Sequence, residues 1–358
     1  MHLRAKDGIE LIQPHMLPAT GNDATPTWAF LNSNESAFGP SPFAISAAQA
    51  ASRRMERYLE FPDRLLAPAI GARFDLDPDR ITVGQGSDDL IARLARAYLR
   101  PGEQIMRSAN GYQKVPNYAY AAGGTALSVP DHDFVPSVYN MIAAMTEEVR
   151  IVYLANPENP AGTYLSGAEV RRLHAAMPDT ALMILDCAYE EYVDAPDFEA
   201  GAALVDALPN VILCRTFSKI FGLAGARVGW CYGPAEIIDV TRRVGLTFPV
   251  AGPSAAAAIA ALEDRGHVDF VRAETIRNRA SLTRALQNLG LRVIPSQANF
   301  VLVELPDAAM AEANLRGDGI LVRRLASPAF DGFMRITIGT QPELDACIHS
   351  LSAFLGAR

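Results

Sequence analysis

Lysine is the charged residue that this chain uses least. Its 358 residues include three lysines, Lys6, Lys114 and Lys219, against twenty-nine arginines. An arginine stays protonated at any workable pH, whereas a lysine amine can lose its proton and attack a carbonyl carbon. Lys6 lies in a polar N-terminal segment, and Lys114 lies in a loop with no recognisable pattern. Lys219, in TFSKIFGLAGARVGW (216–230), is therefore the candidate for lysine chemistry.

Cysteine is also scarce, and its spacing excludes the usual metal sites. The four cysteines, Cys187, Cys214, Cys231 and Cys347, show no metal-ligand spacing. A zinc or iron–sulfur site usually takes thiols or histidines that lie a few residues apart. Three of the four occur in apolar, strand-like runs, so we expect reduced thiols in the core and no metal.

Long hydrophobic runs and an excess of positive charge are absent as well. No run approaches the roughly 18 apolar residues that mark a membrane-spanning helix. The formal net charge of −8 gives no support for binding to nucleic acid or to a membrane surface. The N-terminal segment has no apolar stretch typical of a signal peptide, so we expect a cytoplasmic location.

The central part of the chain alternates short apolar runs with helical patterns. This alternation is typical of a mainly parallel sheet that is buried on both faces. We therefore expect an α/β fold, preceded by a helix over 43–59. The apolar runs are RITV (80–83), EQIM (103–106), TALSV (125–129), VRIVYLA (149–155), TALMILD (180–186), NVILCRT (210–216) and VGWCYG (228–233).

The C-terminal part has a different pattern, which predicts a smaller α+β domain. An Ala-rich helix near 253–263 and an amphipathic helix over 266–289 come first. Strand-like segments follow at 292–305, 319–325 and 334–340. The expected division is an N-terminal arm over residues 1–40 that joins the small domain, a large domain over 41–250 and a small domain over 251–358.

Polar side chains follow five of the predicted strands. Open parallel sheets bind ligands beyond the carboxyl ends of their strands, so we expect these side chains to surround one ligand. They would offer it a phosphate site, an aromatic ring, an amide, a carboxylate, a phenol and an amine. The residues are Ser87, Tyr112, Asn159, Asp186 with Tyr189, and Lys219 with Arg227.

The segment GQGSDDLI (84–91) is typical of a phosphate site at the start of a helix. Its two glycines allow a tight turn, and Ser87 and Asp88 lie where backbone N–H groups are unpaired. Taken alone, the segment also fits an ordinary N-cap at either residue. Position 89 is Asp, so the third glycine of the dinucleotide fingerprint is missing and a nicotinamide dehydrogenase is not expected.

Asp186 and Asn159 each allow a functional and an ordinary interpretation. Asp186 ends an apolar strand, where a carboxylate is costly unless a cation pairs with it. A protonated pyridine nitrogen would be such a partner, and a capping or salt-bridging role is the alternative. NPENPAG is most simply a turn. Its functional interpretation directs the Asn159 amide at a hydroxyl of a cofactor.

Taken together in this order, the segments resemble the fold-type-I aminotransferases that use pyridoxal 5'-phosphate (PLP). The subgroup they resemble most is the histidinol-phosphate aminotransferase family. The resemblance implies a large domain built on a mainly parallel sheet, a smaller α+β domain, and amino-group transfer between an amino donor and a 2-oxo acid. The matching segments are LNSNESAFGPSP (31–42), GQGSDDLI (84–91), NPENPAGT around residue 157, DCAYEEY (186–192), TFSKIFGLAGARVGW (216–230), NFVLVEL (299–305), GILVRRL (319–325) and MRITIGT (334–340).

The resemblance implies a role for each residue at the strand ends. Lys219 would form the Schiff base with PLP and later move a proton, helped by burial and nearby cations that lower its pKa. Asp186 would pair with the pyridinium nitrogen and keep the ring an electron sink. Tyr189 and Asn159 would hydrogen-bond the ring hydroxyl, and Tyr112 would stack on the ring. The residues around the phosphate would be Ser87, Asp88, Thr216, Ser218 and Arg227.

The resemblance also implies a substrate site and a second subunit. Tyr58 would reach the phosphate bound by a neighbouring subunit, which implies a homodimer. Arg335 would bind the substrate carboxylate through a bidentate pair. Arg323 would meet the distal group of the substrate, a phosphate in histidinol phosphate, and the adjacent Arg324 stays an alternative. Asn34, in the first matching segment, is also assigned to the substrate site.

Three segments depart from the family pattern. NPENPAG has Glu158 and Ala161 where the family usually has Asn and Thr, and neither is an expected contact. LEFPD follows Tyr58 in place of the usual Tyr-Pro-Asp-Pro. In IQPHML (12–17), His15 replaces a tyrosine that helps to bind the substrate phosphate in the family, and we assign it to the substrate site. Contact with a phosphate, a different substrate and a plain surface position all stay open for it.

The expected function is transamination of histidinol phosphate with a 2-oxo acid such as 2-oxoglutarate. Two alternatives share the scaffold: an aminotransferase for an aromatic or other amino acid, and an enzyme like threonine-phosphate decarboxylase. A non-catalytic PLP-binding regulator would need a DNA-binding domain. The residues before the first matching segment carry no basic cluster, so we do not expect one.

Overall fold

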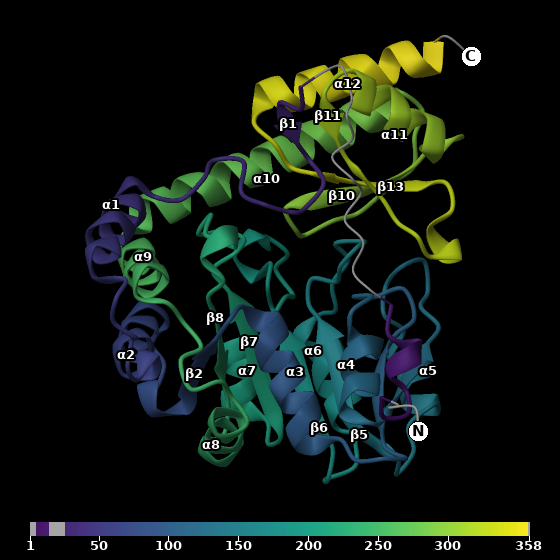
Figure 1. Cartoon of the computed structure of the whole chain (residues 1–358). Helices are drawn as coiled ribbons and strands as arrows, with labels where there is room; N and C mark the ends of the chain where they lie inside the picture. The colour runs from purple at the N-terminus through teal and green to yellow at the C-terminus, as the bar shows by residue number, and fades with distance from the viewer. Residues whose placement is uncertain (1–4, 14–25, 357–358) are drawn as a thin grey trace, which may run out of the picture.

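The computed structural model describes residues 5–13 and 26–356. Figure 1 shows a large domain built on a central sheet, with a small domain above one edge of that sheet. The sheet has seven strands in the order β2-β8-β7-β6-β5-β3-β4. They are β2 (Ile81–Gly84), β3 (Gln104–Ser108), β4 (Thr125–Val129), β5 (Val149–Ala155), β6 (Leu182–Asp186), β7 (Val211–Thr216) and β8 (Gly229–Tyr232).

Each of these strands forms at one of the apolar runs in the sequence. Successive side chains of a strand point to opposite faces, and both faces are buried in all of these strands except the edge strand β4. Met183 and Leu185 of β6 pack into one core, whereas Leu182 and Ile184 pack into the core on the other face. The strands from β4 to β7 pair in parallel, and β8 runs antiparallel to both β7 and β2. The expectation of a mainly parallel sheet is confirmed.

Helices cover both faces of the large sheet (Figure 1). One face carries α3 (Ser87–Tyr98), α4 (Val115–Ala122) and α8 (Ala235–Arg243). The other core includes residues of α1 (Pro42–Ala51), α2 (Pro62–Phe74), α5 (Val138–Ala143), α6 (Gly167–His174), α7 (Gly201–Ala207) and α9 (Gly252–Glu263). Short 3-10 helices are η1 (Ile9–Leu11), η2 (Ser52–Arg54), η3 (Pro78–Arg80), η4 (Glu190–Tyr192), η5 (Ala224–Ala226) and η6 (Pro328–Phe330).

The small domain has a core of its own. Its four-stranded antiparallel sheet has the order β12-β13-β10-β9. Ala29 and Leu31, from the arm, lie in this core, and β1 pairs in parallel with β11. The elements are β1 (Ala29–Phe30), β9 (Val293–Ile294), β10 (Phe300–Glu304), β11 (Ile320–Leu321), β12 (Arg323–Arg324), β13 (Phe333–Thr337), α10 (Arg265–Asn288), α11 (Ala308–Gly317) and α12 (Gln341–Gly356).

The Ala-rich helix α9 packs with the large domain. It lies against α1 and α2, and its residues Ala258 and Leu262 belong to the large-domain core. The long helix α10 has residues in both cores, with Val271 in the large one and Leu286 in the small one. We therefore propose that the boundary between the domains lies within α10, further along the chain than residue 251.

The described helices, the clusters of possible metal ligands and the cysteines bear on three expectations from the sequence. No helix in the part of the chain that the structure describes is long and apolar enough to cross a membrane. Within the same residues, no group of three or more His, Cys, Asp or Glu side chains could hold a metal ion. All four cysteines are buried and free of disulfides.

Candidate active site

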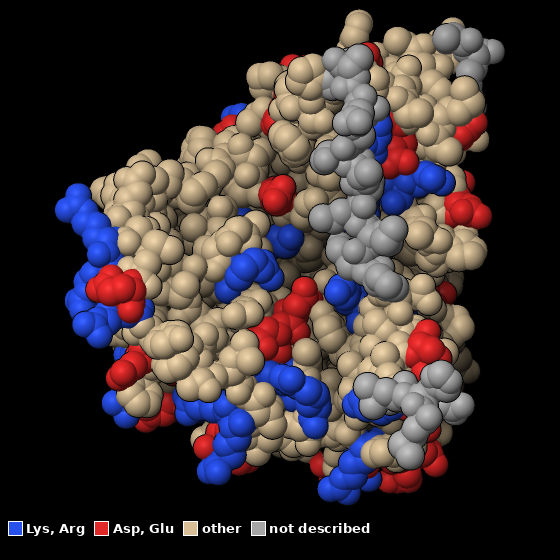
Figure 2. All heavy atoms as spheres, in the orientation of Figure 1, with Lys and Arg blue, Asp and Glu red and all other residues tan. Residues whose placement is uncertain are grey.

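The predicted polar side chains gather where the carboxyl ends of the large sheet face the small domain. Each parallel strand delivers its following turn to this edge, and β13 of the small domain delivers Arg335 from the opposite side. Figure 2 shows acidic and basic side chains together at the centre of the molecule, where the surface is hollowed between the two domains. The arrangement agrees with one ligand site between the domains.

Lys219 lies in the turn that follows β7, and its amine points into this site. Its Nζ donates to the carbonyl oxygen of Ser33 at 3.3 Å and lies 5.7 Å from the centre of the Tyr189 ring. Burial, and then the charge of Arg335, lower the pKa of the Lys219 amine to about 8. The neutral amine is therefore accessible near neutral pH, as lysine chemistry requires.

Asp186 ends β6 and is almost completely buried. The hydroxyl of Tyr153 donates to its Oδ2 at 2.7 Å, and burial raises the pKa of the carboxyl to about 6. Its Oδ1 is buried and has no hydrogen-bond partner among the described residues. Such an oxygen is costly unless a ligand donates to it, and a protonated pyridine nitrogen fits this need. The site therefore fits the ring nitrogen of PLP.

Tyr189 joins the large domain to the arm and to the turn after β5. Its hydroxyl accepts from the Asn34 amide nitrogen at 3.1 Å and from the Asn159 amide nitrogen at 3.4 Å. The ring packs edge-on against Phe300 with centroids 5.1 Å apart. Burial raises the pKa of the Tyr189 hydroxyl to about 12, so the group stays protonated and can donate to a ligand oxygen.

Arg335 is nearly buried and is held on two sides. Nη1 donates to Asn159 Oδ1 and Nη2 donates to the Asn32 carbonyl oxygen, each at 2.8 Å. The guanidinium carbon lies 5.4 Å from the centre of the Phe300 ring. Burial lowers the pKa of Arg335 to about 10, and its Nε has no partner among the described residues. A buried cation that has no carboxylate partner among the described residues suits a carboxylate ligand.

The sheet register separates the two candidate arginines of β12. Arg323 lies directly opposite Arg335 in the antiparallel pair of β12 and β13, so the two side chains share one face of the sheet. Arg324 points the other way and forms an ion pair with Glu312 at 3.2 Å. Of the two, Arg323 is the one on the side of the site.

The segments expected around a phosphate meet beside the start of α3. Gly86, the residue before α3, has a φ of 84°. A Cβ on Gly86 would lie 2.5 Å from Nη2 of Arg227, so the guanidinium packs directly on this turn. Nη1 of Arg227 donates to the hydroxyl of Ser218 at 3.1 Å. The N–H of Ser218 donates to the hydroxyl of Thr216 at 3.1 Å. A helix N-terminus, hydroxyls and a guanidinium together make a favourable anion site.

Asp88 lies in the first turn of α3, and its side chain contacts two tyrosines. Its Oδ1 accepts from the hydroxyl of Tyr112 at 3.1 Å and from that of Tyr118 at 2.6 Å. The carboxylate therefore fixes the Tyr112 ring, which is expected to stack on the cofactor. Tyr118 and Tyr153 are two site residues that the sequence analysis missed. Each contacts a partner about thirty residues away in the sequence, and no local motif signals such a contact.

Two assigned residues are not placed beside this site. Tyr58 is exposed, and its ring stacks on Phe248 with centroids 4.2 Å apart and an interplanar angle of 11°. A contribution from a second subunit, as the resemblance implies, is compatible with this position. His15 lies outside the residues that the structure describes.

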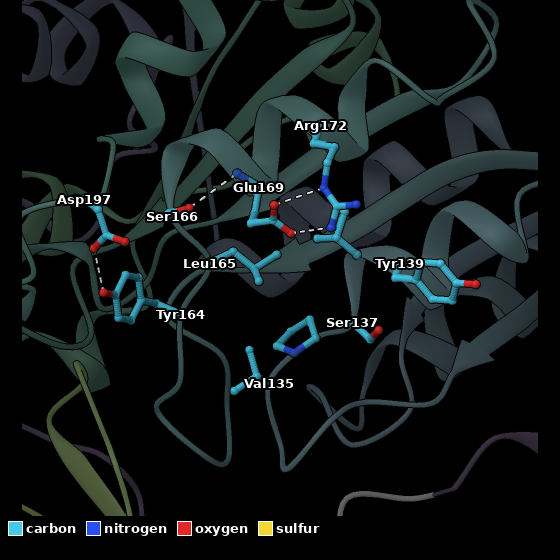
Figure 3. Close-up of a pocket in the computed structure, with 11 residues that line it drawn as sticks. Val135, Ser137, Tyr139, Tyr164, Leu165, Ser166, Glu169, Arg172 and Asp197 are labelled. Atoms are coloured by element: carbon cyan, nitrogen blue, oxygen red, sulfur yellow. Dashed lines mark hydrogen bonds and ion pairs between the residues drawn. The ribbon is translucent and has the colours of Figure 1, made fainter.

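A separate hollow of about 430 Å³ lies between the segment 135–139 and α6 (Figure 3). Its charged side chains satisfy one another: Glu169 pairs with Arg172 at 2.5 Å, and Asp197 accepts from the Tyr164 hydroxyl at 2.7 Å. None of the described residues that were assigned from the sequence lines it, so this hollow is separate from the groups at the strand ends.

Comparison with known proteins places this arrangement in a family. The chain matches the class I and II aminotransferases over residues 26–351, and it belongs to that family. It is 41% identical to the histidinol-phosphate aminotransferase of Granulibacter bethesdensis, over 98% of this chain and 96% of that protein. It is 40% identical to the protein of the same name from Paramagnetospirillum magneticum, over 98% of each chain.

Solved structures agree with the family assignment. The crystal structure of histidinol-phosphate aminotransferase from Sinorhizobium meliloti, in complex with PLP, superposes with a TM-score of 0.87 at 30% identity. That match covers 93% of this chain and 92% of the other. Aspartate aminotransferase from Thermus thermophilus with maleate superposes with a TM-score of 0.80 at 22% identity, which shows the same fold. The expected fold, fold type I, is confirmed.

Proposed function

We propose that this chain is a PLP-dependent aminotransferase that moves the amino group of histidinol phosphate to a 2-oxo acid such as 2-oxoglutarate. Two relatives that match it over almost their whole length carry the name histidinol-phosphate aminotransferase. The structure of a third was determined with PLP. The observation on this chain that carries the proposal is the Oδ1 of Asp186, which is buried and has no hydrogen-bond partner within the described residues. It lies at the edge of the sheet where Lys219 also lies.

The residues of the large domain would hold PLP. Asp186, kept in place by Tyr153, would accept a hydrogen bond from the ring nitrogen and keep it protonated. Tyr189 and Asn159 would donate to the ring hydroxyl, and the start of α3 with Arg227 would hold the phosphate. When bound, PLP supplies an electron sink that stabilises negative charge at the substrate carbon.

Lys219 would act as the nucleophile and the proton carrier. A general acid–base group works best when its pKa lies near the working pH, and the pKa of about 8 meets this condition. Arg335 would bind the substrate carboxylate. Because Asn159 and Asn32 already hold its guanidinium, little conformational freedom is lost on binding.

Arg323 would bind the phosphate of the substrate. It lies opposite Arg335 on the same face of the small sheet, so the two arginines could grip the two ends of one ligand. His15 would be a second contact for the substrate phosphate. A cytoplasmic location stays a prediction from the sequence.

A second copy of the chain would complete the enzyme. Exposed apolar side chains lie on α1, on α2, between these two helices and on the segment before α9. Tyr58 is among them. Its ring stacks on Phe248 but is largely exposed, so its hydroxyl could reach a site in a neighbouring subunit. The exposed residues are Phe43, Ile45, Met55, Tyr58, Phe61, Leu65, Leu246 and Phe248. We propose a homodimer through this surface, which we call the α1–α2 surface.

The substrate is tested with single amino donors on the PLP-loaded protein. The donors are histidinol phosphate, histidinol, phenylalanine, tyrosine, glutamate and threonine phosphate, and the readout is the absorbance change of the bound cofactor. We expect histidinol phosphate to react fastest and histidinol far more slowly, because only the first offers a phosphate to Arg323. In the Arg323→Gln variant this advantage should fall by about tenfold or more, since a charge-assisted hydrogen bond is lost.

Other outcomes of this experiment would contradict the substrate assignment. A preference for phenylalanine or tyrosine would identify an aromatic aminotransferase. Consumption of threonine phosphate with release of carbon dioxide would identify a decarboxylase. An unchanged histidinol phosphate rate in Arg323→Gln, beside normal PLP binding, would remove Arg323 from the phosphate site while the cofactor assignment stands.

A further inference from the structure

Glu158 is a buried carboxylate inside the turn that follows β5. Its side chain is 2% exposed, although the sequence pattern gave it no contact with the site. Its Oε1 accepts from the backbone N–H of Asn159 at 3.0 Å and from the backbone N–H of Tyr112 at 3.2 Å. One oxygen atom therefore joins two segments that are 46 residues apart in the sequence.

These two segments carry groups expected on different parts of the cofactor ring. Tyr112 would lie against the face of the ring, and Asn159 would reach the ring hydroxyl. The far end of Tyr112 is fixed separately, because its hydroxyl donates to Asp88. At the near end, the backbone N–H of Tyr112 in the loop after β3 donates to Glu158. The carboxylate therefore sets the spacing between the stacking ring and the amide.

The surroundings of Glu158 have room for a carboxylate of this length. A Cβ at Gly111 would lie 2.7 Å from Oε2 of Glu158 and 2.9 Å from its Cδ. Gly111 does not have a positive φ, so its backbone conformation does not require glycine. Glycine is required there because a Cβ would clash with the side chain of Glu158. Arg107 donates to the Gly111 carbonyl oxygen at 2.7 Å and holds this backbone against Glu158.

The ionisation of Glu158 agrees with a hydrogen-bonding role. Burial raises the pKa of the carboxyl to about 8, although the N–H of Asn159 and the charge of Arg107 favour the charged form. Below that pH the group is mainly neutral. A neutral carboxyl still offers an oxygen to both N–H groups, so a glutamine of the same length should replace it. An asparagine is one methylene shorter and should not reach both.

We propose that Glu158 is a positioning residue whose side-chain carboxyl group fixes the two backbone segments that present the Tyr112 ring and the Asn159 amide to the cofactor. The inference rests on the proposed function for the identity of that cofactor. The role is specific to a chain with Glu at this position and glycine at 111.

The test compares Glu158→Gln, Glu158→Asn and Glu158→Ala with the unchanged enzyme. Cofactor-free protein is titrated with PLP, and the circular dichroism of the bound cofactor reports the asymmetry of its surroundings. Glu158→Gln should bind PLP within about threefold of the unchanged enzyme, because both hydrogen bonds remain. Glu158→Ala should bind about tenfold or more weakly and lose much of the cofactor signal, because two partly buried N–H groups lose their acceptor. Glu158→Asn should fall between them.

Glu103 provides the matched control. It lies just before β3, the strand that leads to the Tyr112 loop, and its carboxylate also accepts from a backbone N–H, that of Arg100 at 2.8 Å, and from Arg150. Glu103→Ala should lower the unfolding temperature and leave the PLP affinity and the dichroism unchanged. A purely structural role for Glu158 would give this same result.

The outcomes separate this inference from the proposed function. If the unchanged enzyme fails to bind PLP, the proposed function and this inference both fall. If it binds PLP and Glu158→Ala binds it equally well with the same dichroism, the inference alone is wrong. If Glu158→Ala does not fold, the comparison of Glu158→Gln with Glu158→Asn tests the inference. Equal PLP affinity and equal dichroism in these two variants would overturn the positioning role.

Discussion

At the scale of single residues, burial moves the ionisable groups of the site toward their neutral forms. It lowers the pKa of Lys219 to about 8 and that of Arg335 to about 10, and it raises the pKa of Asp186 to about 6. In each case burial is the largest cause, because a charge is poorly solvated there. An anionic ligand would raise the pKa of Arg335 again, and a cationic ring nitrogen would lower the pKa of Asp186 again. The residues are therefore arranged for a ligand that carries both charges.

Replacing Lys219 by methionine should abolish transamination and change the pH dependence of stability. Loss of acid–base catalysis alone should reduce kcat by about 10²–10⁴-fold. Because the folded-state pKa of about 8 lies below the ordinary 10.5, the unfolded chain binds more protons between these pH values. The free energy of unfolding of the unchanged, cofactor-free protein therefore rises with pH through this window. Lys219→Met should be the more stable protein below pH 8, and its advantage should shrink toward pH 10.5.

Denaturant unfolding at a series of pH values measures this difference, and Lys6→Met is the control. Lys6 is exposed and donates to the Ala121 carbonyl oxygen, away from the strand ends. It should keep both the activity and the pH dependence of the unchanged protein. Substantial turnover in Lys219→Met would show that another group performs the chemistry, and parallel stability curves would show that the Lys219 pKa is not lowered.

Residues with a local sequence signal were predictable, and those with only a distant partner were not. Lys219 and Asp186 each stand out from their own segment, and both lie at the carboxyl ends of strands of the large sheet. Tyr153 looked like one more apolar strand residue, and its hydroxyl matters only because β5 lies beside β6. Glu158 was noticed only as a departure from a pattern. Its contact with Tyr112 needs the turn after β5 and the loop after β3 to meet in space.

At the scale of elements, the phosphate site depends on how closely β8 approaches the turn between β2 and α3. Gly229 of β8 pairs with Gly84 of β2 in the antiparallel ladder. A Cβ at Gly229 would lie 2.4 Å from the carbonyl carbon of Gly86 and 2.5 Å from the backbone nitrogen of Ser87. These are backbone atoms, so they cannot turn aside as a side chain can. β8 can therefore approach the start of α3 this closely only because residue 229 has no side chain.

Gly229→Ala should displace the start of α3 and weaken PLP binding. Overpacking of this kind typically costs about 1–3 kcal/mol. If half of this cost falls on the bound phosphate, the affinity for PLP should fall by roughly two- to tenfold. Gly225→Ala is the matched control, because a Cβ there has no heavy atom within 4 Å and the residue lies in the neighbouring η5. PLP titration of both variants measures the effect. Equal affinities would show that β8 does not set the phosphate site.

Elements with a strong apolar period were predicted well, and their ends and partners were predicted less well. All seven strands of the large sheet lie at the apolar runs. Six of them are buried on both faces, which needs an apolar segment, whereas the edge strand β4 is largely exposed or half-buried. The helix expected over 43–59 ends earlier, with α1 finishing at Ala51 and η2 at Arg54. The Ala-rich pattern of α9 predicts a helix, but small side chains fit against almost any surface. It therefore gave no information about which core the helix would join.

At the scale of the whole molecule, the α1–α2 surface is the feature that one chain leaves incomplete. Eight large apolar side chains are exposed there, and Tyr58 is 75% exposed although it is assigned to a phosphate site. Large exposed apolar patches of soluble proteins commonly mark an interface. In a twofold-symmetric dimer the same surface meets itself, so each chain would give its Tyr58 to the other chain.

Subunit complementation tests whether Tyr58 acts in the neighbouring subunit. Tyr58→Phe keeps the ring on Phe248 and removes the hydroxyl, so the chain should still dimerise and bind PLP about tenfold more weakly, as expected for a lost hydrogen bond to a charged phosphate. Lys219→Met chains keep Tyr58 but have no catalytic lysine. When the two variants are unfolded together and refolded, each hybrid dimer has one site with both native residues, or about a quarter of all sites in a random mixture. At limiting PLP the mixture should therefore be more active than either parent.

A mixture no more active than the sum of its parents would place Tyr58 in its own subunit's site. A solution mass of a single chain with full activity would exclude the dimer itself.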